Sequence, residues 1–223
     1  NARLVIVNDV DWLTEKQIEL PAHASVLTVE HIKRLAENSK IHAAAAMEVF
    51  IQNAAPSLAA YSIYTSGSTG TPKAVQVSQQ ALIDFIDSAN CVYQITQNDH
   101  VLQFAPLHFD ACIEEIFISL CFGATLSIRS KAMVESFNAF NDTLKTLEIT
   151  FLDLPTAFWH EWVKFNSDFD ITPALSISRV IIGGEACKPS AIAEFFKLKH
   201  SAKLINTYGP SEATVVATTK ILD

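Results

Sequence analysis

Strand and helix signals alternate regularly along the chain from residue 60 to its end, and this alternation limits the possible folds more than any other feature. Apolar runs typical of strands occur at 62–64, 101–104, 124–128, 149–153, 180–182 and 203–206. Helical spacing occupies 78–93, 110–121, 133–147, a segment that opens at Pro155, and 188–198. Strands separated by helices of this length indicate an α/β fold, with layered, largely parallel sheets flanked by helices.

The first 59 residues carry weaker signals. Residues 3–8 predict a buried strand, residues 29–38 predict a helix, and the alanine-rich stretch 41–60 predicts a helix followed by a loop at Pro56. We therefore divide the chain into an amino-terminal part, 1–59, and a core, 60–223.

Composition excludes several classes of partner. Apolar residues make up 49% of the chain and charged residues 18%, which is typical of a globular protein. The formal charge of −8 disfavours nucleic acid and anionic membrane surfaces. The longest apolar segment, 116–128, is too short and too interrupted to span a membrane, and no secretory leader is visible. The four cysteines form no CxxC pair, so we expect free thiols and a cytoplasmic protein.

Ligands of open α/β sheets bind beyond the carboxyl ends of the strands. The unusual polar segments of this chain follow predicted strands, at 65–73, 108–115, 183–185 and 206–212. The strongest signal is TSGSTGTPK, residues 65–73, in which glycines expose backbone N–H groups, hydroxyls add donors and Lys73 adds a positive charge. Its spacing differs from the P-loop pattern. The sequence predicts a phosphate-binding loop; the alternative is an ordinary polar surface loop.

This loop resembles the signature of the adenylate-forming superfamily, which includes acyl-CoA synthetases, luciferases and the adenylation domains of nonribosomal peptide synthetases. Two further segments agree in order and spacing. Residues 206–212, NTYGPSE, resemble the motif NxYGPTE, with serine in place of threonine. Residues 109–111 and 115–117, FDA and EIF, resemble the peptide-synthetase branch. The likeness covers 60–223 well and 1–59 loosely.

The resemblance implies ATP and Mg²⁺ as cofactors and assigns roles to individual residues. Thr65, Lys73 and Glu212 would be catalytic, with Glu212 holding the metal. Glycines 183 and 184 would admit the flat adenine, Asn206 would pair with its amino edge and Ser211 would contact the α-phosphate. The full predicted nucleotide site is Thr65, Ser66, Gly67, Ser68, Thr69, Gly70, Lys73, Gly183, Gly184, Glu185, Asn206, Thr207, Tyr208, Gly209, Ser211 and Glu212. The alternative explanation for residues 206–209 is that they form an ordinary turn, which Asn and Gly favour.

The same resemblance places an amino-acid site beside the nucleotide. Asp110 would pair with the α-ammonium, the alternative being that it caps the helix after it. The predicted substrate-binding residues are His108, Asp110, Ala111, Glu114, Asp153, Ile181, Gly183, Thr207, Val215 and Val216, and the alternative for His108 is an ordinary core or surface histidine. Glu114 and Asp153 are extra carboxylates, which would repel one another unless the substrate brings a cation. We therefore predict a basic amino acid such as lysine or ornithine, with glutamine or another polar residue as the alternative.

The predicted activity is ATP-dependent formation of an aminoacyl-AMP, followed by transfer to the phosphopantetheine thiol of a carrier protein or to CoA. The family's small carboxy-terminal domain is absent from the sequence, so we expect this chain alone to be poorly active. Two alternatives remain open at this stage: an acyl- or aryl-CoA ligase, and a non-catalytic remnant that binds nucleotide.

Overall fold

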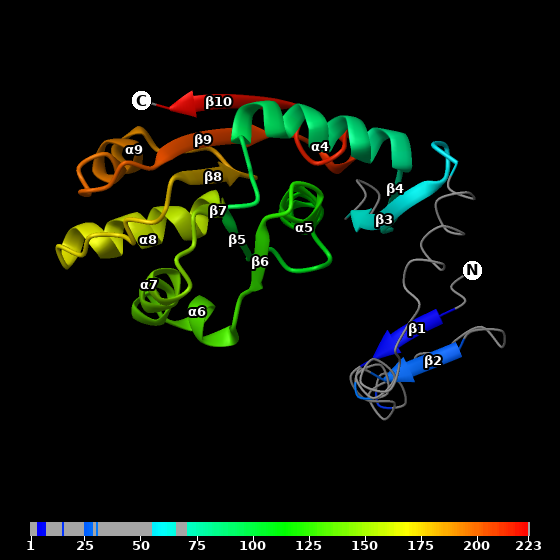
Figure 1. The fold of residues 1–223 in the computed structure, drawn as a ribbon, viewed down its shortest axis with the longest axis horizontal. Coiled ribbons are helices and arrows are strands. Elements are labelled where there is room, and N and C mark those ends of the chain that lie inside the picture. Colours follow the sequence, from blue (N-terminus) through cyan, green and yellow to red (C-terminus); the bar gives the residue numbers. More distant parts are fainter. Residues whose placement is uncertain are drawn as a thin grey trace. The chain divides into compact units, whose positions relative to one another are not determined.

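A computed structural model describes residues 4–7, 15, 25–28, 30, 55–65 and 71–222 (Figure 1). The chain divides into two compact units, 1–54 and 55–223. In the first unit, β1 (Leu4–Val7) and β2 (Ser25–Thr28) form a parallel pair, and β1 lies within the strand predicted over 3–8. The helix predicted over 29–38, and the alanine-rich segment up to residue 54, lie outside the described residues apart from residue 30.

The second unit is built on a six-stranded sheet with the order β10-β9-β8-β7-β5-β6. Its strands are β5 (His100–Gln103), β6 (Thr125–Ile128), β7 (Phe151–Pro155), β8 (Arg179–Gly183), β9 (Lys203–Tyr208) and β10 (Thr218–Leu222). All neighbours pair in parallel except β10, which is antiparallel to β9. The predicted α/β class with a largely parallel sheet is confirmed.

Helices cover both faces of this sheet, and its central strands β5, β7, β8 and β9 are mostly buried. On one face pack α4 (Gln79–Tyr93) and α5 (Ala111–Cys121). On the other pack α6 (Lys131–Glu135), α7 (Phe137–Thr146), α8 (Thr156–Asp168) and α9 (Pro189–Phe195). Successive strand residues alternate between the two cores: Val101 and Phe151 face α4 and α5, whereas Leu102 and Leu152 face the other layer.

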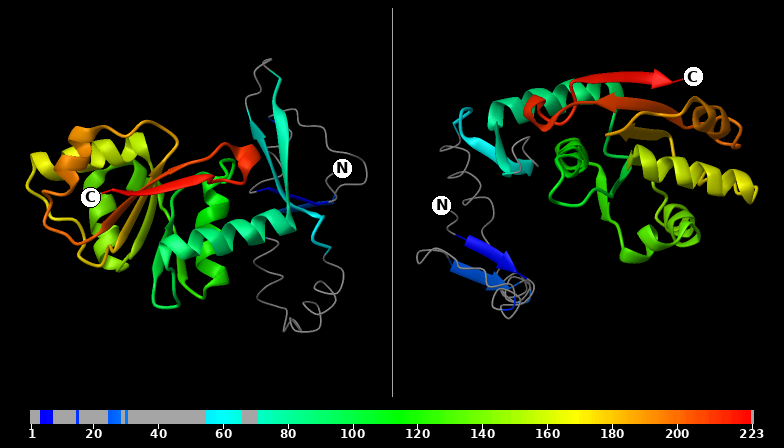
Figure 2. Two further views of the ribbon diagram at one scale, coloured as in Figure 1. Left: turned by 90° about the horizontal axis from the view of Figure 1, so that it is seen from above. Right: turned by 180° about the vertical axis from the view of Figure 1, so that it is seen from behind.

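A separate hairpin precedes the sheet. Strands β3 (Ala59–Thr65) and β4 (Lys73–Ser78) pair antiparallel, with Thr65 opposite Lys73 at the open end of the connecting loop. A short 3₁₀ helix, η1 (Ser211–Ala213), lies between β9 and β10. In both views of Figure 2 the hairpin lies beside the turn that contains η1.

Several boundaries differ from the sequence predictions. The helix expected over 133–147 is two helices, because Ser136 adopts an extended backbone and its side chain caps α7. Strands β4 and β10 were not predicted. Pro155 closes β7 and precedes α8, rather than lying in its first turn. Ser78 caps α4 as predicted, accepting a hydrogen bond from the Ala81 N–H at 3.2 Å.

Among the described residues, no helix combines the length and the apolar character needed to cross a membrane. All four cysteines are free thiols, as predicted; Cys112 is buried and Cys121, in the same helix, is exposed.

Candidate functional site

The hairpin and the η1 turn, far apart in the sequence, meet in the second unit. Strand β4, which begins at Lys73, contacts the 3₁₀ helix that carries Glu212. Both side chains are exposed, so they are available to a ligand. Thr65 closes the base of the hairpin loop, where its hydroxyl donates a 3.5 Å hydrogen bond to the carbonyl of Lys73. The remaining predicted loop residues, Ser66, Gly67, Ser68, Thr69 and Gly70, lie outside the described part of the chain.

The turn that presents Glu212 is strained. Thr214 and Val215 follow η1 with φ angles of 61° and 67°, in the left-handed region that β-branched residues disfavour. A Cβ on Gly209 would lie 2.3 Å from the carbonyl oxygen of Val215, so glycine is required for the chain to pass this closely. The Ala217 N–H donates to the Tyr208 carbonyl at 2.9 Å and closes the turn. Strain of this kind is held in place by surrounding packing and is concentrated at functional sites.

A second edge of the candidate site lies at the end of β8. Gly184 has a φ of +86°, and Gly183 packs so closely on β9 that a Cβ would lie 2.5 Å from Thr207 Oγ1. On β9, the side-chain oxygen of Asn206 is buried and has no hydrogen-bond partner among the described residues. An unpaired buried acceptor is unfavourable in the free protein and fits a ligand N–H donor. Tyr208 and Glu185 are exposed nearby along the chain, and Ser211 is half-buried.

Asp110 stands at the N-cap position of α5 but does not cap it. Its backbone is helical (φ −66°, ψ −22°) and its side chain makes no capping hydrogen bond, so the capping alternative is wrong. The helix is instead attached to β5 through Glu115. That buried carboxylate accepts hydrogen bonds from the backbone N–H groups of Phe104 and Ala105 at 2.9–3.1 Å, and from the Gln103 amide at 3.0 Å.

Glu114 and Asp153 are buried carboxylates in the same part of the structure, 2% and 8% exposed respectively. Burial raises the pKa of Glu114 well above its ordinary value, and repulsion from Asp153 and Asp110 adds to this. Burial likewise raises the pKa of Asp153, and Glu115 and Asp110 contribute. Glu114 Oε1 has no hydrogen-bond partner among the described residues. No ion pair to either carboxylate occurs among the described residues, and the raised pKa values favour the neutral forms of both groups.

Strand register places the other predicted acid-binding residues on the same face. Asp153 pairs with Ile181, which pairs with Ile205 on β9. Because side chains two apart share a face, Gly183 and Thr207 lie on this side too, the side covered by α4 and by α5, which carries Ala111 and Glu114. Asp153 lies inside β7, not at its end, because the strand continues to Pro155. Val215 is buried and Val216 half-buried in the core of this face.

Comparison with known proteins identifies the family of the chain. The family model described as "AMP-binding enzyme" matches residues 1–223. The chain belongs to this family. The predicted resemblance to the adenylate-forming superfamily is thereby confirmed.

Relatives of the AMP-binding chain include long synthetases. It is 47% identical over 160 residues, 71% of its length, to an isonitrile lipopeptide synthase from Streptomyces coeruleorubidus. It is 34% identical over 206 residues, 89% of its length, to a delta-poly-L-ornithine synthetase from Acinetobacter baumannii. The matches span only 11% and 15% of these two relatives.

Solved structures support the fold of the AMP-binding chain. It superimposes on the N-terminal subdomain of Klebsiella oxytoca NpsA, in complex with 3-hydroxyanthranilyl-AMSN, with a TM-score of 0.71. The sequence identity is 20%, and the alignment covers 100% of this chain and 51% of that one.

The donors for a metal in this AMP-binding chain are few. The described residues contain no group of three His, Cys, Asp or Glu side chains able to hold a metal ion. Glu212 is one exposed carboxylate beside the hairpin. This donor set fits Mg²⁺ that arrives with ATP, because such an ion is bound through one or two carboxylates and the phosphates rather than by an all-protein cage.

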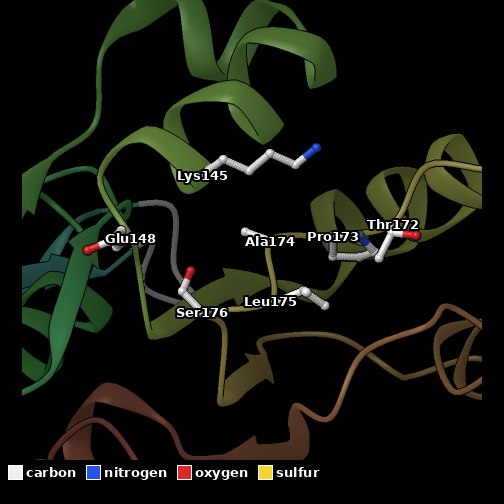
Figure 3. A pocket seen from close by; sticks show the side chains of 7 residues that line it. All are labelled: Lys145, Glu148, Thr172, Pro173, Ala174, Leu175 and Ser176. Carbon is white, nitrogen blue, oxygen red and sulfur yellow. The ribbon is translucent and has the colours of Figure 1, made fainter.

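One predicted residue has no observed link to the site, and one cavity lies apart from it. His108 is exposed, and its ring packs on Phe109 with centroids 4.6 Å apart. A cavity of about 450 Å³ lies at the other end of the strands, before β7 and β8 (Figure 3). It contains none of the predicted site residues; it is lined by Lys145, Glu148, Thr172, Pro173, Ala174, Leu175 and Ser176.

Two residues were missed as parts of the site. Glu115 was noted for its resemblance to the EIF segment, and its role in holding α5 on β5 emerges only from the hydrogen bonds. Tyr93 ends α4 and is completely buried, close enough to Glu114 and Asp153 for both to raise its pKa, after the larger effect of burial. No sequence motif marks a tyrosine at a helix end.

Proposed function

We propose that this chain binds ATP and an amino acid and joins them as an aminoacyl-AMP in the full-length protein. The observation that carries the proposal is the contact between β4, which starts at Lys73, and η1, which carries Glu212. A cation and a metal-binding carboxylate at one place suit a triphosphate with its magnesium ion. Membership of the AMP-binding family supports the same reading.

In the reaction, a carboxylate oxygen of the amino acid forms a bond to the α-phosphorus of ATP. The bond from that phosphorus to its bridging oxygen breaks, and pyrophosphate leaves. Lys73 and Thr65 would bind the phosphates that depart, so that negative charge moves toward a fixed cation. Asn206 Oδ1 would accept a hydrogen bond from the adenine amino group, which pairs its buried orphan oxygen. Mg²⁺, held by Glu212, would neutralise phosphate charge when bound.

The acid would enter under α5. Asp110 is not used as a helix cap, which leaves its carboxylate for the α-ammonium of a substrate. Acids without an amine would leave Asp110 without a cationic partner, beside the buried Glu114 and Asp153. This disfavours the acyl- or aryl-CoA ligase alternative.

The side chain of the substrate would be basic. Glu114 and Asp153 are buried on one face of the sheet, and one Glu114 oxygen has no partner. A second ammonium would supply the missing cation, whereas an acidic side chain would be repelled. The name of the Acinetobacter relative, a poly-L-ornithine synthetase, agrees with a diamino acid. The relative named as a lipopeptide synthase also supports transfer of the product to a carrier-protein thiol.

The test is amino-acid-dependent pyrophosphate exchange by the full-length protein, with lysine, ornithine, glutamine, norleucine and glutamate compared. We expect the diamino acids to give the highest kcat/KM. Exchange with glutamate or norleucine alone would overturn the side-chain assignment. No exchange with any amino acid, together with retained ATP binding, would favour the non-catalytic alternative.

Two variants sharpen this test. Asp110→Ala should lower kcat/KM for every amino acid by at least about thirtyfold, because truncating one partner of a buried charge pair costs about 2–5 kcal/mol. Glu114→Gln keeps the side-chain volume and should lower the preference for lysine over norleucine. Glu135→Gln, at an exposed pair with Lys131, is the matched control and should change neither quantity.

A further inference from the structure

Tyr93 reaches the carboxylate pair from an element that carries no predicted site residue. It ends α4, its ring packs on Phe151 with centroids 5.6 Å apart, and its side chain is completely buried. Phe151 and Asp153 share a face of β7, because they are two residues apart. The Tyr93 ring therefore lies one pleat before Asp153, on the side of the sheet that α5 covers.

The Tyr93 hydroxyl makes no hydrogen bond of ordinary geometry in the free protein, although it lies close enough to Glu114 to interact with that carboxylate as a donor. Both this hydroxyl and Glu114 Oε1 are buried atoms with no partner among the described residues. The hydroxyl nevertheless lies within electrostatic range of both Glu114 and Asp153. Buried Tyr hydroxyl groups normally find a partner, and a phenol beside a buried carboxylate is suited to a ligand that supplies N–H donors to both.

We propose that Tyr93, Glu114 and Asp153 together bind the distal ammonium of an α,ω-diamino acid, with Tyr93 as a specificity-determining residue. This rests on the proposed function and extends it to a residue of α4. An ammonium group has three N–H donors. The three side chains offer it one phenolic oxygen and two carboxylates, and the phenolic proton remains free to pair with Glu114. Every orphan polar atom of the trio then gains a partner.

The main experiment is Tyr93→Phe in the full-length protein, assayed by pyrophosphate exchange with lysine and with norleucine. Norleucine has nearly the shape of lysine but lacks the distal amine. Removing a hydrogen bond to a charged group should raise KM for lysine roughly 10- to 150-fold, with kcat unchanged. KM for norleucine should stay the same. An equal change for both acids, or no change for lysine, would overturn the role of Tyr93.

Tyr61→Phe is the matched control, because it removes another buried tyrosine hydroxyl without a partner, from β3. It should leave the ratio of the lysine and norleucine KM values unchanged, and a ratio shifted as much as by Tyr93→Phe would overturn the proposal. The wild-type protein distinguishes a failure of the basic-substrate function from a failure of the Tyr93 role. If it does not prefer lysine over norleucine, the basic-substrate function fails; if it does, and Tyr93→Phe preserves that preference, this inference alone fails.

Proton release gives a second readout that does not depend on a variant. Burial, and secondarily repulsion from neighbouring carboxylates, raises the pKa values of Glu114 and Asp153, so the free site holds protons to higher pH than isolated carboxyls. A bound ammonium favours the ionised carboxylates. Calorimetry of lysine binding in buffers of different ionisation enthalpy should show proton release, and norleucine should show none. Equal proton release for the two ligands would overturn the assignment of the ammonium to this trio.

Discussion

Replacing Gly183 by alanine tests how the end of β8 is fitted to β9. A Cβ at this position would lie 2.5 Å from Thr207 Oγ1, whereas ordinary van der Waals contact begins at 3.4 Å, so the oxygen must retreat by about 0.9 Å. The Thr207 carbonyl, 3.3 Å from the same Cβ, belongs to a strand paired on both sides and cannot yield easily. The side chain of Thr207 must therefore rotate and give up its 3.1 Å hydrogen bond to the Ile182 carbonyl.

The expected loss of stability has two parts. Losing the hydrogen bond costs about 1 kcal/mol, and the steric overlap at this half-buried position costs about 1–3 kcal/mol. Gly183→Ala should thus lower the free energy of unfolding by about 2–4 kcal/mol. Thr207→Ala removes the obstructing oxygen, so the double variant should be more stable than the sum of the two single effects by about 1–2 kcal/mol.

Urea unfolding followed by tryptophan fluorescence measures these differences, because Trp159 and Trp162 are fully buried in the second unit. Gly184→Ala is the control. Its φ of +86° penalises alanine by about 1–2 kcal/mol, but a Cβ there meets nothing within 4 Å, so Thr207→Ala should not relieve it. Strict additivity of Gly183→Ala and Thr207→Ala would refute the reasoning from the close contact.

Three further outcomes follow from charges and caps. The folded-state pKa of Asp153 is raised, so the folded protein binds more protons than the unfolded one. The free energy of unfolding therefore falls as pH rises above the ordinary carboxyl pKa. Asp153→Asn should make this fall less steep in unfolding curves measured from pH 4 to 8. For Asp99, burial alone would raise the pKa, but hydrogen bonds from Thr150 and Thr96 and the charge of Arg179 lower it. The stabilisation that ionised Asp99 provides is therefore lost as pH falls through its folded-state pKa. Asp99→Asn should weaken the pH dependence of the unfolding free energy below pH 4. Ser78→Ala should cost about 1 kcal/mol of unfolding free energy, and Ser130→Ala, which removes an N-cap serine without a capping bond, should cost less than half of that.

The sequence predicted the layered sheet because its hydrophobic runs and helical spacings are strong and regular. It also predicted that residues near 73 and 212 come together, and β4 does contact η1. The assigned roles of these residues stay predictions. The hairpin partner β4 was missed because Lys73–Ser78 joins a glycine-rich loop to a helix cap, which hid the alternation of Val75 and Val77.

Other features depend on tertiary packing that no local pattern reveals. Thr214 and Val215 adopt left-handed conformations that their own preferences oppose, so the sequence alone argues against the observed turn. Tyr93 was missed for a different reason: a buried aromatic residue at a helix end is ordinary core, and only the neighbouring carboxylates give its hydroxyl a special setting.

The adjacent residues Glu114 and Glu115 of α5 differ in how tightly the fold constrains them. Glu115 is tied to the backbone of Phe104 and Ala105, so exchanging it would detach the helix from β5. The Oε1 atom of Glu114 makes no such attachment, and the carboxylate interacts with Asp153 and Tyr93 instead. A library that randomises position 114 while keeping position 115 should therefore yield many folded members that differ in the acid they accept, and the same asymmetry would let natural descendants diverge in substrate without rebuilding the scaffold.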